Sequence, residues 1–512
     1  MAKEVNIIKS RTHYSMVNSS VSAIIYLLRT LLGFVSRSFF IHYLGVNFLG
    51  LNGLFTNVLS FLSLAELGIG FTIVYELYSP LATGDTETTK SLMLVYRKAY
   101  TIIGIVVGVA GICLVPFLSL IIHGTSGISN VYQYYLLFLS NSVVSYFFTY
   151  KRSLLNADQK NYITVVNDFV FYSASVVLQI LFLVLYQDYS IFLIIQVLTT
   201  LASNIYISSV VNKQYPYIRE KNVKPLSKAV STELKKNILG NMSTQIGSII
   251  VLGSDNILLS AFVGLSAVGI YSNYTLITNA VKSIVQQATS SIISSVGNLV
   301  AKKDNLKIFS VFQEYWFINS SASFLTSTIT FALINGFISV WIGPKYLLPR
   351  KTVCLIATYL IVLMYQGSTR TFISAYGLFW QQRWKPIFEA GTNLGFSLFF
   401  LQVFHLGLDG VLLGTICSSI FVNAWYEPYI AFKFGFHQSL YMYFLRTLLF
   451  YMKYSVAIAV LWIVQLHLFV DSLMSFVRFT FVSVILVGVL YLLLFSWEKE
   501  FRSAFNRFKR MI

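Results

Sequence analysis

Charged side chains are scarce in this sequence. Asp, Glu, Lys and Arg make up 11% of the 512 residues, whereas a soluble domain has about 25% charged residues. Hydrophobic residues account for 56%, and the mean hydropathy is +0.70. Apolar runs of about 20 residues recur along the whole chain, and each is long enough to cross ~30 Å of hydrocarbon as a helix. The composition therefore excludes an ordinary soluble protein.

Cysteine and histidine are also rare, which argues against disulfide and metal chemistry. The three cysteines, Cys113, Cys354 and Cys417, lie in or beside apolar runs and form no CxxC motif. We interpret them as small core residues. The six histidines are scattered, mostly at the ends of apolar runs. The sequence thus predicts no metal site and no cofactor.

Catalytic signatures are missing as well. The chain contains no HExxH, no Gly-x-Ser-x-Gly and no Walker-type glycine loop. Its longest connection between apolar runs, residues 212–237, is too short for a catalytic domain. We therefore expect a protein that is not an enzyme, and any transport to be driven without ATP bound to this chain.

The apolar runs predict an all-α polytopic membrane protein. Unpaired backbone groups are not tolerated in lipid, so each run must be helical, and the alternating segments of a β-barrel are missing. No cleavage site follows the first run, which we take as a spanning helix and not a signal peptide. We predict fourteen spans, at about 18–43, 51–79, 97–121, 131–152, 162–186, 189–211, 238–262, 267–299, 311–341, 352–378, 385–405, 410–433, 447–469 and 473–496.

The distribution of basic residues supports this topology. With both termini in the cytoplasm, 29 Lys and Arg residues fall on the inner side and three on the outer side, as expected when basic loops stay inside. The formal net charge of +18 is thus spread over short loops that face anionic lipid. We expect membrane lipids as partners and no nucleic acid.

An internal repeat divides the chain. A shift of 219 residues places "HYLGVNFLGLNGLF" (42–55) on "AFVGLSAVGIYSNY" (261–274). The same shift aligns Gly45 with Gly264, Gly50 with Gly269, Asp85 with Asp304 and Tyr96 with Tyr315. Because six spans precede the restart, the halves enter the membrane from the same side and form parallel repeats.

The repeat predicts a domain organisation suited to alternating access, in which two lobes rock about a site between them. The predicted parts are a six-helix lobe at 1–211, a basic cytoplasmic linker at 212–237, a second six-helix lobe at 238–433, and two extra helices with a basic tail at 434–512.

Basic residues inside the spans are the candidate substrate ligands. A central Arg or Lys costs roughly 2.5–3.5 kcal/mol on insertion scales, and usually faces a bundle interior or a wet cavity. Arg29 lies near the middle of the first span, Arg37 lies eight residues further out, and Lys282 and Arg370 lie at middle to inner depth. Such cations suit an anionic substrate, because guanidinium groups bind phosphate through paired hydrogen bonds.

Acidic residues inside the spans leave two interpretations open. They could form buried pairs that fix the packing, and the repeat places Asp255 beside Arg37, so that an Arg37–Asp255 pair between the lobes is plausible. Glu76, Glu389 and Glu427 could be further pairing or interfacial residues. Alternatively, Glu66 or Asp255 could bind a proton or sodium ion that couples to transport.

Four stretches resemble one known family: "FIHYLGVNFLGLNGLFTNVLSFLSLAELGIG" (40–70), "YKRSLLNADQKNY" (150–162), "DNILLSAFVGLSAVGIYSNY" (255–274) and "GLFWQQRWKPIFEAGTNL" (377–394). They are similar to the Wzx-type polysaccharide flippases of the multidrug/oligosaccharidyl-lipid/polysaccharide exporter superfamily. The resemblance covers essentially the full length.

The resemblance implies a carrier that moves polyprenyl-pyrophosphate-linked oligosaccharide units from the inner to the outer leaflet of the bacterial cytoplasmic membrane. The units would serve assembly of capsule, O-antigen or other surface polysaccharide, alongside a polysaccharide polymerase and glycosyltransferases, and we expect a monomer. A cationic lumen is a family feature that Arg29 fits best. Related peptidoglycan-precursor flippases also carry a cation on the second span, where this chain has Glu66 and Glu76 instead.

Two other functions remain open. A cation-coupled multidrug exporter has the same architecture and needs carboxylates in its lumen, but the excess of central basic groups counts against it. A membrane-embedded glycosyltransferase or polymerase ranks last, because the chain has no long outer loop and no clustered acid and base.

Overall fold

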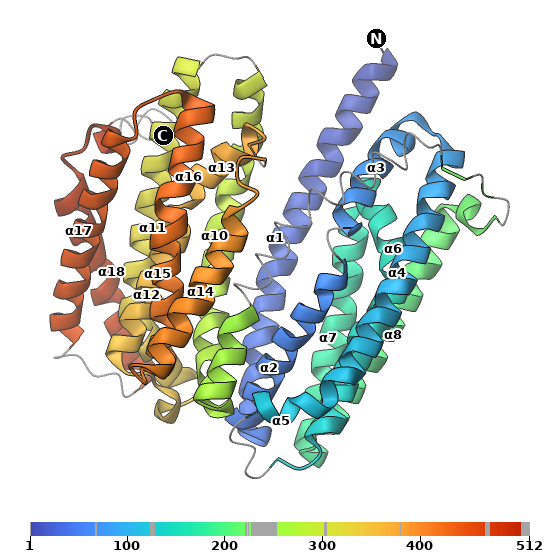
Figure 1. Cartoon of the computed structure of the whole chain (residues 1–512), viewed down its shortest axis with the longest axis horizontal. Coiled ribbons are helices and arrows are strands. Elements are labelled where there is room, and N and C mark those ends of the chain that lie inside the picture. The colour runs from blue at the N-terminus through green and yellow to red at the C-terminus, as the bar shows by residue number, and fades with distance from the viewer. Residues whose placement is uncertain are drawn as a thin grey trace. The chain divides into compact units, whose positions relative to one another are not determined.

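The structure is a computed structural model, and it describes residues 2–66, 69–122, 128–220, 223, 225–226, 253–301, 305–378, 380–465 and 472–502. These residues are mostly helical and include no strand (Figure 1). Tertiary contacts divide the chain into two compact units, Met1–Gly269 and Ile270–Ile512. The predicted all-α polytopic fold is confirmed.

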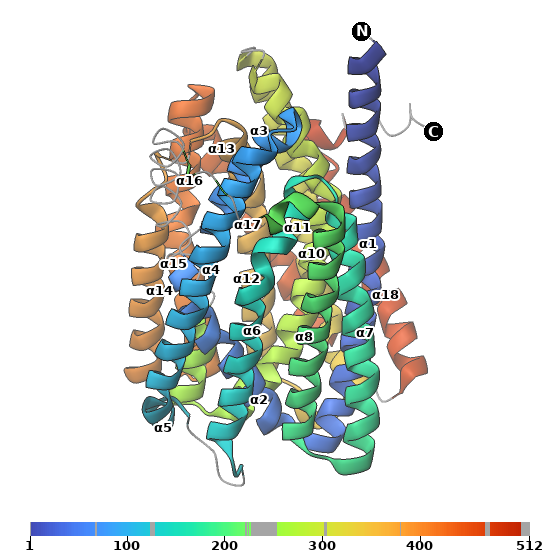
Figure 2. The same ribbon diagram turned by 90° about the vertical axis from the view of Figure 1, so that its right-hand side faces the viewer.

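The N-terminal unit is a bundle of long helices. It contains α1 (Ala2–Leu44), α2 (Val46–Leu62), η1 (Ser63–Glu66), α3 (Ile69–Thr83), α4 (Thr86–Leu114), η2 (Val115–Phe117), α5 (Leu118–Ile121), α6 (Val131–Ala157), α7 (Asn161–Tyr186), α8 (Tyr189–Gln214) and η3 (Pro216–Arg219). Figure 2 shows α4, α6, α8 and α7 as neighbouring helices, and α1 packs on α7.

The C-terminal unit repeats this organisation with more interruptions. It contains most of α10 (Leu265–Ala301), then α11 (Asn305–Trp341), η4 (Pro344–Tyr346), α12 (Arg350–Tyr365), α13 (Gly367–Ala375), α14 (Lys385–Gln402), α15 (Leu408–Ser418), η5 (Ser419–Asn423), α16 (Ala424–Ile430), η6 (Ala431–Phe436), α17 (Tyr441–Gln465) and α18 (Leu473–Phe495). Both η5 and η6 are π-helical turns, which often occur at functional sites.

Nine helices among the described residues are long and apolar enough to cross a membrane. They correspond to nine of the fourteen predicted spans. Of the other five, 238–262 lies largely outside the described residues, 51–79 is broken, and 385–405 is α14, whose 18 residues include Lys385 and Glu389. The remaining two are α6 and α10, long helices that carry many polar residues. On α6 these polar residues line a cavity.

The second predicted span is broken at its middle. Its helix ends at Leu62, a 3-10 turn occupies Ser63–Glu66, and α3 begins at Ile69. The apolar run continues through this break, so hydropathy alone does not reveal it. Discontinuous helices in transporters often mark ion or substrate sites.

The repeat is visible in the backbone. Gly45 and Gly264 are aligned by the 219-residue shift, and both have positive φ, at +86° and +118°, a region that favours glycine. Each directly precedes a helix, α2 and α10 respectively. A Cβ on Gly50 would lie 1.9 Å from the Leu265 carbonyl oxygen, and one on Gly269 would lie 2.2 Å from the Val46 carbonyl oxygen.

These two close approaches are symmetric, because Leu265 is the repeat partner of Val46. The first turns of α2 and α10 therefore cross, and at each of the two contacts a glycine of one helix lies against the backbone of the other.

Asp85 is another residue that the repeat aligns, and it caps α4 by accepting a hydrogen bond from the Thr88 amide at 3.0 Å. The side-chain hydrogen bond from Thr88 lowers the pKa of the Asp85 carboxyl below its ordinary value. Its partner Asp304 lies outside the described residues.

The contact boundary at Gly269 differs from the predicted start of the second lobe at 238. Residues 253–262 are helical, and Gly253 contacts Phe61, which groups this segment with the N-terminal unit. More than half of 212–237, more than half of 238–262 and residues 503–512 lie outside the described residues. The domain boundaries drawn from the repeat stay a prediction.

Candidate functional site

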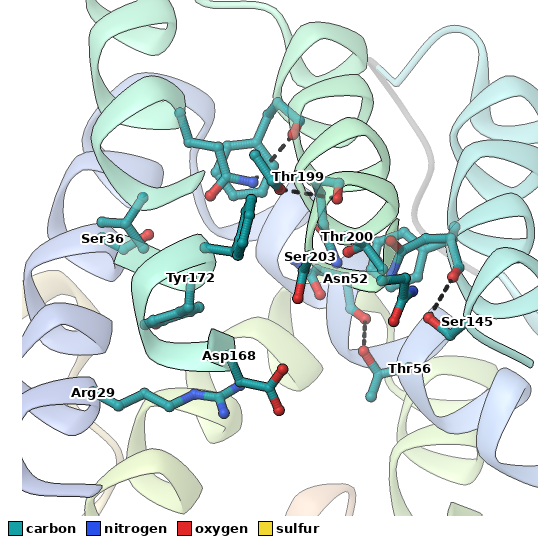
Figure 3. Close-up of a pocket in the computed structure, with 18 of the residues that line it drawn as sticks. Arg29, Ser36, Asn52, Thr56, Ser145, Asp168, Tyr172, Thr199, Thr200 and Ser203 are labelled. Carbon is teal, nitrogen blue, oxygen red and sulfur yellow. Dashed lines mark hydrogen bonds between the residues drawn. The ribbon is translucent and has the colours of Figure 1, made fainter. Parts of the chain in front are cut away.

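A polar cavity lies inside the N-terminal unit. Its volume is about 570 Å³, and side chains of α1, α2, α6, α7 and α8 line it (Figure 3). Ligand pockets in proteins commonly measure about 300–1,000 Å³. The cavity is therefore large enough for a small ligand or for part of a larger one.

The helices that form the cavity carry polar residues at helical spacing. On α6, Asn141, Ser145, Thr149 and Arg152 line it at steps of three and four residues, so they share one face. The polar face of α8 consists of Gln196, Thr199, Thr200, Ser203 and Asn204. Two polar faces thus turn toward each other inside a unit whose outer surface carries many exposed aliphatic residues.

Arg29 is the cavity residue that the sequence singled out. It comes from α1, and its guanidinium carbon lies 4.7 Å from the ring centroid of Tyr172 on α7, a cation–π contact. In the described part of the chain Arg29 forms no ion pair. Figure 3 shows Arg29 and Tyr172 on the same side of the cavity as Ser36. Its positive charge is therefore not neutralised by a carboxylate among the described residues.

A second guanidinium in the cavity is fully engaged. Arg152 pairs with Asp168 of α7, with Nη1 2.5 Å from Oδ1. The same side chain donates to the Asn204 Oδ1 at 3.1 Å and to the Ser203 hydroxyl at 2.9 Å, both on α8. Arg152 thereby ties α6 to α7 and α8. The pair adds no net charge to the cavity.

Arg370, in the C-terminal unit, likewise forms an ion pair with a carboxylate. Its Nε lies 2.9 Å from Glu427 Oε1, and its Nη2 donates to Gln366 Oε1 at 2.6 Å. Glu427 is fully buried and also pairs with Lys385 at 2.6 Å. Asn423 donates to Glu389 nearby at 2.5 Å. The structure thus places Arg370 in a buried ion-pair network, and its role as a substrate ligand stays a prediction.

Arg152 and Arg370 are related by the repeat, with the shift reduced by one residue to 218. The neighbouring residues agree: the buried Tyr96 hydroxyl bonds to Ser153 at 2.8 Å, and the buried Tyr315 hydroxyl bonds to Thr371 at 3.5 Å. Each unit thus has an arginine late in its fourth span that pairs with a carboxylate on a later helix. This equivalence favours a structural role for Arg370.

The other predicted residues are placed as follows. Lys282 lies half-buried on α10, close enough to Arg370 for the two like charges to interact. Arg37 lies half-buried on α1 and interacts electrostatically with Tyr172, although Arg37 does not line the cavity. Asp255 lies in the helical segment 253–262. The Arg37–Asp255 pair stays a prediction.

Glu66 lies at the break in the second span. The Tyr100 hydroxyl of α4 donates a hydrogen bond to Glu66 Oε1, and a Cβ on Gly70 would lie 2.7 Å from the same oxygen. The rings of Tyr96 and Tyr100 are in contact, with centroids 4.7 Å apart. The Glu66 carboxylate therefore lies beside a tyrosine hydroxyl and does not line the cavity.

Sequence reasoning missed Arg152 as a residue of the cavity. Arg152 was counted among the basic residues of an inner loop, since it lies at the end of an apolar run. The structure places it on α6, which continues to Ala157. Two features of the sequence could have identified Arg152. It lies at helical spacing from Asn141, Ser145 and Thr149, and the internal repeat aligns it with Arg370.

Comparisons with known proteins agree with the fold and with one family. A family model described as "Polysaccharide biosynthesis protein" matches residues 15–294, more than half of the chain. A comparison with curated proteins found no match.

Solved structures of transporters share the fold. One is the lipid II flippase MurJ in an inward closed conformation, with a TM-score of 0.63 and 15% identity, covering 95% of this chain and 98% of that chain. An inward-facing multidrug resistance MATE family transporter of the MOP superfamily has a TM-score of 0.61 and 15% identity, covering 81% and 98%. A MOP superfamily transporter from Pyrococcus furiosus has a TM-score of 0.54 and 14% identity, covering 84% and 97%.

Proposed function

This chain belongs to the polysaccharide biosynthesis protein family, and on that premise we propose that it is a flippase for lipid-linked oligosaccharides. It binds a glycan attached to a polyprenyl pyrophosphate at the inner leaflet and releases it at the outer leaflet. It works by alternating access, in which the substrate site opens first to one side of the membrane and then to the other. The products feed the assembly of capsule, O-antigen or another surface polysaccharide.

The position of Arg29 in the cavity is the main observation that supports this proposal. A guanidinium on a membrane helix is costly, and this one faces a polar cavity with its charge unpaired among the described residues. A pyrophosphate offers the oxygens to which a guanidinium binds through parallel hydrogen bonds. The contact with Tyr172 holds the guanidinium in place when no anion is bound. Lys282 is a second candidate contact for the anion.

The same proposal includes a location in the cell and a set of partner enzymes. The protein lies in the bacterial cytoplasmic membrane with both termini in the cytoplasm, where glycosyltransferases build the lipid-linked unit. A polymerase on the outer side consumes it. We propose that the protein works as a monomer among membrane lipids and without a cofactor.

Substitution of Arg29 tests the proposal. We expect Arg29→Ala to reduce flipping of lipid-linked oligosaccharide in proteoliposomes at least tenfold, the loss of about one charge-assisted hydrogen bond. Arg29→Lys keeps the charge but loses the paired geometry, so we expect an intermediate rate. The control is Arg478→Ala, which removes an exposed arginine of α18 outside the cavity. Unchanged flipping by Arg29→Ala at normal protein abundance would refute the role of Arg29.

The alternative is a cation-coupled multidrug exporter of the same superfamily. An organic cation needs a free carboxylate, but the one carboxylate among the described cavity residues, Asp168, is neutralised by Arg152. A drug-susceptibility panel on a deletion strain separates the two functions. If the protein is a flippase, the deletion strain should show no drug-specific change in susceptibility. If it is an exporter, the deletion strain should be more sensitive to particular cationic drugs.

A further inference from the structure

We propose that the cavity of the N-terminal unit is a glycan subsite, which binds sugar residues of the lipid-linked substrate next to the pyrophosphate contact at Arg29. This inference rests on the proposed function and specifies which part of the substrate the cavity recognises. The subsite is formed by the facing polar sides of α6 and α8.

Two amide atoms in the cavity wall lack hydrogen-bond partners. Within the described part of the chain, Asn141 Oδ1 on α6 and Asn204 Nδ2 on α8 are shielded from solvent and form no hydrogen bond. Leaving such groups unmet costs free energy, so water or a ligand must satisfy them. One is an acceptor and the other a donor. A sugar hydroxyl both donates and accepts, and therefore satisfies either group.

The hydroxyl groups on the same faces are arranged as acceptors. Thr149, Ser145 and Thr199 each donate to the backbone carbonyl four residues earlier, at 2.8, 3.0 and 2.8 Å. Their protons are thus used within the helix, while their oxygen lone pairs stay available. Sugar hydroxyls can donate to these oxygens and replace water with equivalent hydrogen bonds.

Aromatic rings complete the wall. Phe138 and Phe192 are largely buried at the cavity, and Phe171 is half-buried beside Tyr172. Rings of this kind present apolar faces and polar edges, so they can pack against the C–H face of a sugar. The wall therefore offers both hydroxyl acceptors and aromatic rings, and this combination matches a pyranose, which has both polar and apolar surfaces.

Charge and size exclude other occupants. With Arg152 and Asp168 paired, Arg29 is the net charge among the described lining residues. A polyprenyl tail would displace water from a wall that carries twelve neutral polar side chains besides Tyr172 and would offer no hydrogen bond to replace it, which is unfavourable. A volume of about 570 Å³ cannot hold a long glycan, so the subsite binds only the sugars nearest the pyrophosphate.

The test compares two ligands on the full-length protein in nanodiscs: lipid-linked oligosaccharide extracted from the source cells, and bare polyprenyl pyrophosphate. Native mass spectrometry measures both affinities. We expect the wild type to bind the glycosylated ligand about tenfold tighter, the effect of one to two net hydrogen bonds. Asn141→Leu and Thr200→Val should each remove most of this preference and leave the affinity for the bare ligand unchanged. The control, Ser140→Ala, alters an exposed residue next to Asn141 that does not line the cavity.

Each other result is informative. Equal binding of both ligands by the wild type would overturn the glycan subsite and leave the flippase intact. Equal losses for both ligands in Asn141→Leu, with a lowered melting temperature, would show that Asn141 is structural and would also overturn it. If the wild type bound neither ligand, the proposed function itself would fail.

Discussion

The two repeat-related arginines differ in how exposed their carboxylate partners are. Glu427 is fully buried, whereas the Asp168 side chain is 38% exposed. Removing one partner of a buried pair costs about 3–5 kcal/mol, because the remaining charge loses its compensation. An exposed carboxylate is instead solvated by water. The same substitution should therefore have different effects in the two units.

We predict that Arg370→Ala lowers the free energy of unfolding by about 3 kcal/mol, at the lower end because Lys385 still pairs with Glu427. Arg152→Ala should cost less. Melting temperatures of the purified variants in detergent measure both changes. Arg370→Ala with Glu427→Gln is the matched control, since it removes the buried carboxylate that has lost one of its two cations while Lys385 keeps Glu389 as a partner, and it should recover part of the loss. A larger loss for Arg152→Ala would contradict this ranking.

At the scale of elements, the crossing of α2 and α10 depends on glycine at two points. A methyl group on Gly50 would lie 1.9 Å from the Leu265 carbonyl oxygen, closer than any real contact. The backbone must shift to accept it. Such overpacking typically costs 1–3 kcal/mol, that is, roughly 2 kcal/mol here.

We therefore predict that Gly50→Ala and Gly269→Ala each lower the melting temperature in detergent. Gly391→Ala, on α14, is the matched control, because its Cβ would have no atom within 4 Å. This control should leave stability unchanged or raise it slightly, since alanine favours helix. Equal melting temperatures for Gly50→Ala and Gly391→Ala would show that the crossing yields without cost.

The broken second span is the element that we associate with ion coupling. Glu66 ends its 3-10 turn and accepts a hydrogen bond from Tyr100, so a proton or sodium ion bound there would act on the break. We predict that Glu66→Gln abolishes any response of flipping to imposed pH or sodium gradients. Tyr100→Phe keeps the carboxylate and should retain the response. The test is carried out in proteoliposomes, and indifference of the wild type to both gradients would exclude coupling at Glu66; Asp255→Asn examines the other candidate.

At the scale of the whole molecule, an even number of spans places both termini on one side. We predict that a fluorescent protein fused after Ile512 is fluorescent in bacteria, because it stays in the cytoplasm. Alkaline phosphatase inserted near Lys345 should be active, because the predicted topology places this loop outside. Active phosphatase at the C-terminus would mean an odd number of spans.

Much of this organisation could be predicted from the sequence, because hydropathy and glycine positions are local signals. The repeat anticipated the two positive-φ glycines, Gly45 and Gly264, and Arg29 was identified by its depth in an apolar run. Pairings were harder: Arg370 and Glu427 are 57 residues apart, and hydropathy does not report which way a side chain points. The break at Ser63–Glu66 was hidden for a related reason, since its residues continue an apolar run.

All seven tryptophans of the chain lie at Trp316 or later, so the N-terminal unit contains none. The rings that line its cavity are phenylalanine and tyrosine. Events in this cavity are therefore nearly invisible to the intrinsic fluorescence of the protein, which reports on the C-terminal unit. A single Phe171→Trp substitution would introduce an indole at the cavity wall, and its emission would follow the arrival of a glycan directly.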